Sequence, residues 1–112
     1  MEETITWQDF SKIDMRIGTI IAALDFPEAR NPSYKLHVDF GDKIGVRKTS
    51  AQITEKYKKE DLIGLQVTAV VNFPKKQIAD FMSECLILGA VDNSSVVLLQ
   101  PQMKVPNGLK IS

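Results

Sequence analysis

The side chains of this sequence that are best suited to chemistry are basic and lie in the middle of the chain. Residues 35–76 hold nine basic and five acidic side chains, although the whole chain has 14 of each. Lys and Arg bind nucleic acid through its phosphates, and Ser adds neutral hydrogen bonds. We therefore consider as nucleic-acid contacts Lys35, Arg47, Lys48, Ser50, Lys75 and Lys76. A solvated surface without a partner is the alternative interpretation of the same charge pattern.

The residues that commonly support catalysis are few and scattered. His37 and Cys85 are the single histidine and cysteine, and neither lies within a catalytic motif. A zinc site would need more His or Cys ligands, and the acids Asp14, Asp39 and Asp61 lack the spacing typical of metal or glycoside chemistry. The glycines match no phosphate-binding fingerprint. We therefore expect no enzymatic activity, no metal site and no cofactor.

Alternating hydrophobicity predicts the strand that carries two of the basic side chains. Over residues 34–40 every second residue is apolar, which is the pattern of a half-buried strand. The buried face would consist of Tyr34, Leu36, Val38 and Phe40. Lys35 and His37 are then expected on the opposite, polar face.

A turn over residues 41–43 is expected to connect this strand to the next. A three-residue loop would pair Val38 with Val46 on the buried face, whereas a two-residue loop would break the apolar pattern. This register places Arg47 beside Lys35 and His37 on the outer face. The three basic side chains would then form one patch.

Short strands and turns are expected over most of the remaining chain. The sequence predicts further strands over residues 15–24, 65–71, 85–88 and 96–99, a helical turn over 78–83 and a loose C-terminal segment. Gly18 would allow a bulge or bend in the first strand. Many short strands without a βαβ rhythm favour an all-β fold, a small OB-type Greek-key β-barrel with short helices. We expect one domain over residues 1–112, with a helical extension over 1–13 and a C-terminal extension over 100–112.

A short helix outside the barrel suggests a homodimer. Thr6 followed by Asp9 is typical of a helix start, so we predict a helix over residues 7–12. Trp7 and Phe10 would share one face of this helix. Two turns of helix are not stable alone, and a small domain gains stability by covering apolar surface. We therefore assign Trp7 and Phe10 to a dimer interface.

The sequence shows no signal for export or membrane insertion. Glu2 and Glu3 stand where a signal peptide would carry basic residues, and no apolar run approaches the roughly 20 residues of a membrane span. Cys85 lies in an apolar run and is expected to be a core residue in a reducing compartment. A cytoplasmic protein is the expectation.

A family resemblance is carried by segments spread from about residue 10 to residue 108. These are residues 14–18, 26–30, 39–41, 49–54, 70–74 and 83–84, together with Lys35. In this order they resemble the CsaA family of export-related chaperones, and the Asp14-x-Arg16-x-Gly18 element is shared with the wider tRNA-binding domain. The resemblance implies an OB barrel that forms a homodimer through its terminal extensions.

The same resemblance implies two classes of partner. The CsaA family implies unfolded polypeptides or preproteins and the export machinery, whereas the tRNA-binding domain implies tRNA, with Lys35, Asn72 and the Ser83-Glu84 loop near the RNA. Related tRNA binders usually continue Ser-Glu with Gly-Met, where this chain has Cys85-Leu86. The departure favours a chaperone over an RNA binder.

The two hypotheses need different surfaces. A chaperone needs accessible apolar side chains at a groove, for which the candidates are Phe73, Pro74, Phe81 and Met82. Closure of the barrel's end is the alternative role of these four residues. An RNA binder would instead use the basic rim.

Overall fold

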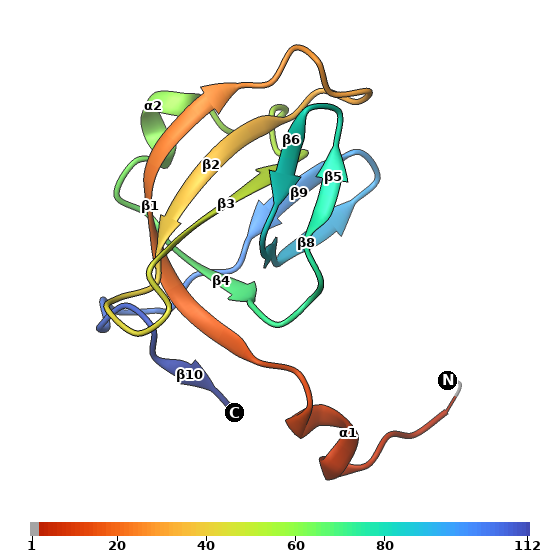
Figure 1. Cartoon of the computed structure of the whole chain (residues 1–112), viewed down its shortest axis with the longest axis vertical. Coiled ribbons are helices and arrows are strands. Elements are labelled where there is room, and N and C mark those ends of the chain that lie inside the picture. Colours follow the sequence, from red (N-terminus) through yellow and green to blue (C-terminus); the bar gives the residue numbers. More distant parts are fainter. Residues whose placement is uncertain (1–2) are drawn as a thin grey trace.

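The structure is a computed structural model that describes residues 3–112, so Glu2 lies outside the described residues. Two short helices are present, α1 (Trp7–Ser11) and α2 (Lys59–Leu62). The strands are β1 (Met15–Asp25), β2 (Tyr34–Asp39), β3 (Val46–Ala51), β4 (Gln66–Val70), β5 (Lys76–Ile78), β6 (Phe81–Ser83), β7 (Leu86–Ile87), β8 (Gly89–Asp92), β9 (Ser95–Leu98) and β10 (Lys110–Ile111). Figure 1 shows their arrangement.

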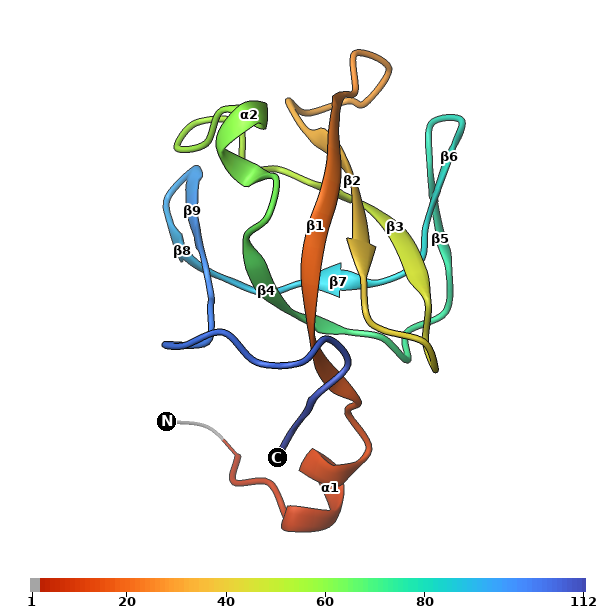
Figure 2. The same cartoon turned by 90° about the vertical axis from the view of Figure 1, so that its left-hand side faces the viewer.

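The main sheet curls into a nearly closed barrel. Its strand order is β3-β2-β1-β4-β7, all pairs are antiparallel, and β10 pairs with the start of β1. The hairpins β5–β6 and β8–β9 stand outside this sheet, and Figure 2 shows them on either side of β7. The expected all-β, OB-type barrel is confirmed.

The long strand β1 bends at a bulge that the sequence places wrongly. The register with β2 shifts between Ile20 and Ala22, not at Gly18. Gly18 serves a different purpose, because a Cβ atom there would lie 2.6 Å from Val38 Cγ1 and 2.7 Å from the Phe40 ring. The glycine leaves room for these inward side chains of the neighbouring strand β2 and the residue that follows it.

The β2–β3 hairpin differs by one residue from its predicted register. Val38 pairs with Arg47 instead of Val46, and the loop covers the four residues 41–44. Gly41 and Gly45 have φ angles of 87° and 80°, which accommodate the extra residue. A shift of one residue moves every side chain of β3 to the other face. Val46 is therefore 53% exposed instead of buried.

The barrel interior is filled by apolar side chains from several strands of the curled sheet. Apolar side chains with 1% exposure or less include Ile20, Leu36, Val38, Phe40 and Val67. Helix α2 contributes Leu62, which is fully buried and belongs to the same cluster. The alternating pattern of residues 34–40 thus predicted correctly which face of β2 is buried.

Residues 78–83 form part of a β-hairpin, so the prediction of a helical turn is wrong. Lys76 pairs with Ser83 and Ile78 pairs with Phe81, with only Ala79 and Asp80 between the strands. Ala79 adopts a φ of 53°, which makes the tight reversal possible. The tertiary position of the hairpin, not its own helix propensity, decides this segment.

The C-terminal segment is fastened to the barrel and is not loose. The side-chain amide of Gln66 donates to the Val105 carbonyl at 2.7 Å, and its oxygen accepts from the Val105 N–H at 3.0 Å. Thr19 donates to the side chain of Asn107 at 2.7 Å. These contacts position β10 beside β1.

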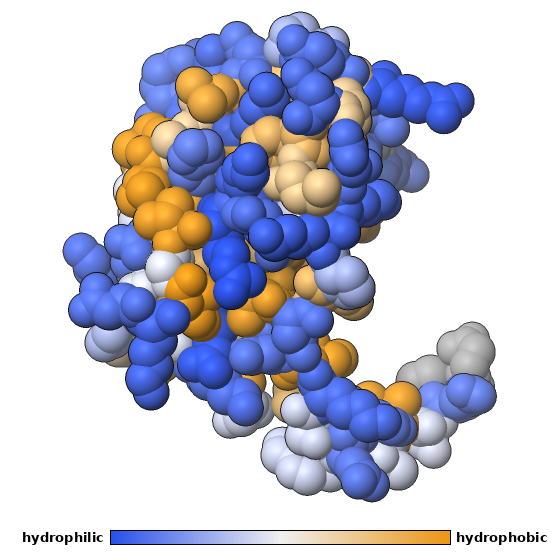
Figure 3. Space-filling model, viewed as in Figure 1, coloured by the Kyte–Doolittle hydropathy of each residue, from blue (hydrophilic) through white to orange (hydrophobic). Residues whose placement is uncertain are grey.

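Helix α1 stands off the barrel at one end of the molecule (Figure 2). The helix starts where Thr6 and Asp9 predict it, and these two residues form a capping box by exchanging hydrogen bonds between side chain and backbone. Trp7 and Phe10 share one face, with ring centroids 5.5 Å apart, and Trp7 is 73% exposed. Apolar atoms appear beside this helix in Figure 3. No helix among residues 3–112 is long and apolar enough to cross a membrane.

Candidate ligand-binding surfaces

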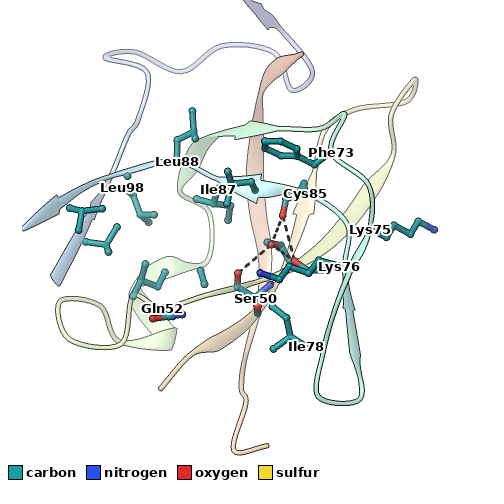
Figure 4. Close-up of a pocket in the computed structure, with 18 of the residues that line it drawn as sticks. Ser50, Gln52, Phe73, Lys75, Lys76, Ile78, Cys85, Ile87, Leu88 and Leu98 are labelled. Carbon is teal, nitrogen blue, oxygen red and sulfur yellow. Dashed lines mark hydrogen bonds between the residues drawn. The ribbon is translucent and has the colours of Figure 1, made fainter. Parts of the chain in front are cut away.

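An open apolar groove of about 1130 Å³ lies between the two outer hairpins (Figure 4). Its walls come from β3, β5, β7, β8 and β9. The apolar lining includes Ile53, Phe73, Pro74, Ile78, Ile87, Val96 and Leu98. Among the described residues that line the groove, only Lys75 and Lys76 carry a charge. The groove can therefore accept apolar side chains next to a positive charge.

The floor of the groove is fixed by a buried polar network. The Thr49 hydroxyl donates to the Cys85 carbonyl at 2.7 Å and lies 2.9 Å from Ser83 Oγ. Burial of hydroxyl groups is favourable only when they are hydrogen-bonded, as both are here. The Ser83 hydroxyl thus points into the protein, and its expected contact with RNA stays a prediction.

The barrel closes at β3 through hydrogen bonds to Ser83 and Glu84 that take the place of a strand ladder. The Lys48 N–H donates to Glu84 Oε1 at 3.0 Å, and the Glu84 N–H donates to the Lys48 carbonyl at 2.8 Å. The Ser50 N–H points to Ser83 Oγ at 3.4 Å. The Ser83-Glu84 element therefore joins β3 to the connection between β6 and β7.

Phe81 anchors the β5–β6 hairpin on the barrel and is not available to a ligand. Its side chain is 7% exposed, and its ring centroid lies 5.4 Å from that of Phe26. The ammonium groups of Lys35 and Lys48 lie 5.4 Å and 5.2 Å from the centre of the Phe81 ring. Such cation–π contacts are attractive. The expectation that Phe81 is accessible is therefore wrong.

The remaining apolar candidates divide between the groove and the outer surface. Phe73 is 55% exposed, and both Phe73 and Pro74 line the groove. Met82 is 36% exposed but pairs with Gln77 on the opposite face of the hairpin from Phe81, and it is not part of the groove lining. Only Phe73 and Pro74 of the four candidates can therefore touch a groove ligand directly.

The outer face of β2 and β3 carries the basic candidates in a different combination from the predicted one. The register pairs His37 with Lys48 and Lys35 with Ser50, so these four side chains share a face. Arg47 lies on the other face, where its guanidinium donates to the Val71 carbonyl at 3.1 Å. The predicted patch of Lys35, His37 and Arg47 is wrong, because it rested on the shifted hairpin register.

Asn72 links the N-terminal extension to the end of β4. Its side-chain oxygen accepts from the Asp14 N–H at 3.0 Å, and its amide group donates to the Lys12 carbonyl at 2.8 Å. Next to it, Arg16 donates to Asp14 at 2.6 Å and to the Gly108 carbonyl at 3.0 Å. The contact of Asn72 with RNA stays a prediction, while its observed role is to position α1.

Cys85 is a buried thiol below the groove. Burial raises its pKa from 9.0 to about 11, although the hydrogen bond with Thr49 acts in the opposite direction. The thiol is therefore protonated and unreactive near neutral pH. No three His, Cys, Asp or Glu side chains within residues 3–112 are grouped as a metal site would require.

Comparison with known proteins gives two kinds of match. Residues 15–110 match the family described as the putative tRNA binding domain. The crystal structure of the chaperone CsaA from Bacillus anthracis is 52% identical, with a TM-score of 0.93, over 98% of this chain and 100% of that one. The CsaA chaperone from Picrophilus torridus is 54% identical, with a TM-score of 0.91, over 97% and 100%.

The curated relatives are longer proteins. The methionine–tRNA ligase of Thermococcus kodakarensis is 35% identical over 109 residues, which is 97% of this chain. The chain spans only 14% of the length of that ligase. The resemblance noted in the sequence, to CsaA chaperones and to the tRNA-binding domain, is confirmed by these matches.

The buried thiol makes the stability of the protein pH-dependent in alkali. The pKa of Cys85 is higher in the folded state than in the unfolded chain. The contribution of the protonated thiol to the free energy of unfolding is therefore fully present below about pH 9. It is lost as the pH rises toward about 11. Between about pH 8 and about pH 10.5 the wild type should lose about 2 kcal/mol more than Cys85→Ala. Urea unfolding of both proteins measures this, and equal losses would contradict the assignment.

Proposed function

The chain belongs to the family of the putative tRNA-binding domain, and on that premise we propose that it is a dimeric, non-enzymatic chaperone that binds unfolded or export-bound polypeptides. Two solved structures of more than 50% identity are described as CsaA chaperones, which supports this choice within the family. A role in export, including contact with the export machinery, and a cytoplasmic location belong to the same proposal. The free, buried Cys85 suits a reducing compartment.

The observation that carries the proposal is the apolar groove with Phe73 on its rim. Unfolded polypeptides expose the apolar side chains that folded proteins bury, and burial of such surface stabilises a complex by roughly 25 cal/mol per Å². The groove volume of about 1130 Å³ is enough for several side chains at once. Exposed apolar surface of this kind on a small protein marks an interaction site.

The groove is also built to keep its shape without a ligand. Its floor is held by the buried network of Thr49 and Ser83, and one wall is anchored by Phe81. A preformed site loses little conformational entropy on binding, so more of the burial free energy appears as affinity. This favours tight binding of an apolar segment that fits the groove.

Phe73→Ser should weaken the binding of an unfolded polypeptide about tenfold or more. Removing a ring that becomes buried against the client costs about 1.5 to 3 kcal/mol, and each 1.4 kcal/mol is tenfold in affinity. The affinity is measured by fluorescence anisotropy. The labelled partner is a client protein that is kept unfolded by reduction and alkylation. Circular dichroism and thermal melting establish that the barrel is intact.

The matched control for this change is Met82→Ser. It removes another exposed apolar side chain from the neighbouring hairpin, but one that lies outside the groove. It should leave the affinity within about twofold of the wild type. Equal weakening by both variants would show that the client does not use the groove.

Dimer formation is supported by the apolar surface at the N-terminal end. Ile5 and Trp7 are 68% and 73% exposed, and Ile13 is 40% exposed. Helix α1 is held in place by Asn72 but is not covered by the rest of the described chain. A second copy that covers this surface would remove it from water.

Trp7→Ala together with Phe10→Ala should convert the dimer to a monomer at micromolar concentration. Light scattering measures the mass of the wild type and the double variant. Val91→Ser is the control, because Val91 is as exposed as Trp7 but lies on β8, away from α1. A wild type with the mass of one chain, or a double variant that stays dimeric, would contradict this interface.

RNA binding is the second candidate, favoured by the shared face of Lys35, His37, Lys48 and Ser50. OB barrels present the outer face of their second and third strands to oligonucleotides. The likeness to a methionine–tRNA ligase over 97% of this chain supports tRNA as the RNA class. The ring of Phe81 is buried beneath the lysines, so we expect phosphate contacts without base stacking on that ring.

Lys35→Gln together with Lys48→Gln should lower tRNA affinity and its dependence on salt. Each lost phosphate contact reduces the slope of log affinity against log salt by about 0.7 to 0.9. Titrations at several salt concentrations measure this slope. Lys104→Gln with Lys110→Gln removes the same charge from exposed positions elsewhere and should leave the slope unchanged. A slope that falls equally in both pairs would exclude the β2–β3 face.

A further inference from the structure

Strand β5 has an edge without a partner beside the apolar groove. Among residues 3–112, β5 pairs only with β6, and β6 in turn lies against β3, where Ser83 accepts from the Ser50 N–H. The other edge of β5 is therefore open. An open strand edge presents main-chain donors and acceptors that readily pair with another extended chain.

The register of the hairpin identifies the groups on this edge. Only two residues separate Ile78 from Phe81, so this closing pair is the hydrogen-bonded one. Hydrogen-bonded and non-hydrogen-bonded pairs alternate along an antiparallel ladder, which makes Gln77 and Met82 a non-hydrogen-bonded pair. The main-chain N–H and C=O of Gln77 therefore point away from β6, toward the open edge.

The side chains of β5 show which way an added strand would face. Lys76 and Ile78 share a face of the hairpin with the buried residues Ser83 and Phe81, and both line the groove. Figure 4 shows Lys76 and Ile78 directed into the pocket, whereas Lys75 points away from it. Because neighbouring strands keep their side chains in step, every second residue of an added strand would enter the groove.

The charge of the groove indicates one property of the occupant. Lys75 has an ion-pair partner, since its ammonium group lies 3.7 Å from Glu84 Oε2. Lys76 is the other charged side chain of the groove lining; it is exposed and directed into the pocket (Figure 4). A carboxylate directly across from Lys76 on an added strand would form a favourable cross-strand pair.

We propose that the groove captures an extended polypeptide segment that adds a strand to the open edge of β5. Every second side chain of this segment is apolar and lies in the groove, and one inward position beside Lys76 is acidic. The inference rests on the proposed chaperone function and specifies the conformation and chemistry of its client. Because main-chain hydrogen bonds are the same for all sequences, strand addition lets one groove hold many clients.

The first test uses the wild-type protein and methylated peptides. A labelled peptide of about nine residues alternates apolar and Ser residues, and one Asp replaces one of its apolar residues. In one variant of this peptide the main-chain N–H groups of the apolar residues and the Asp are methylated. In the other variant the main-chain N–H groups of the Ser residues are methylated. One set should bind at least about tenfold more weakly than the other, because only alternate N–H groups face β5. Equal affinity of the two sets would overturn strand addition.

The second test changes the protein edge. Gln77→Pro removes the outward N–H without breaking the ladder with β6, whereas Gln77→Ala keeps it. Peptide affinity should fall several-fold or more with Gln77→Pro and stay unchanged with Gln77→Ala, as measured by anisotropy. Equal affinities would overturn the proposal, and so would conversion of a dimer to a monomer by Gln77→Pro, since the edge would then bind a second copy.

The third test exchanges charge. Lys76→Glu should weaken binding of the Asp peptide and strengthen binding of a peptide with Lys in its place. Lys104→Glu is the control, because it reverses a charge at an exposed position outside the groove and should change neither affinity. If the wild type binds the Lys peptide more tightly than the Asp peptide, the proposal of an acidic client residue beside Lys76 is overturned. These outcomes are distinguishable from failure of the proposed function, in which no peptide and no unfolded polypeptide binds at all.

Discussion

The outer edge of β3 is the place where this barrel has to close without a strand ladder. Its N–H groups need acceptors, because an unsatisfied main-chain group in a partly buried position costs about 1 to 3 kcal/mol. The Glu84 carboxylate and the Ser83 hydroxyl supply these acceptors. The same two residues hold the end of β6 against β3, so closure of the barrel also determines where the β5–β6 hairpin stands.

The position of this hairpin creates both candidate surfaces. Its inner face forms one wall of the apolar groove, and Phe81 is packed beneath Lys35 and Lys48 of the β2–β3 face. The groove and the basic face therefore share an anchor. A change at Phe81 would disturb both surfaces, which makes Phe73 and Gln77 the more informative positions for separating peptide binding from RNA binding.

Much of the fold was predictable from local pattern. The period-two alternation of residues 34–40 identified the buried face of β2, and Thr6 with Asp9 identified the start of α1. The register of the β2–β3 hairpin was not predictable from the local pattern, because hydrophobicity favours burial of Val46, whereas the structure exposes Val46 and pairs the Arg47 guanidinium with the distant Val71 carbonyl. This single step moved Arg47 to the opposite face and changed the composition of the basic patch.

The sequence alone determined the all-β class, the strand that carries Lys35, the helix with Trp7 and Phe10, and the family resemblance, because these depend on local periodicity and on motifs. Tertiary structure decided which polar groups are free to bind a ligand. Asn72 and Ser83 satisfy main-chain groups that are distant in sequence, and Phe81 is covered by Lys35 and Lys48. Such long-range hydrogen bonding and burial exist only once the barrel has closed.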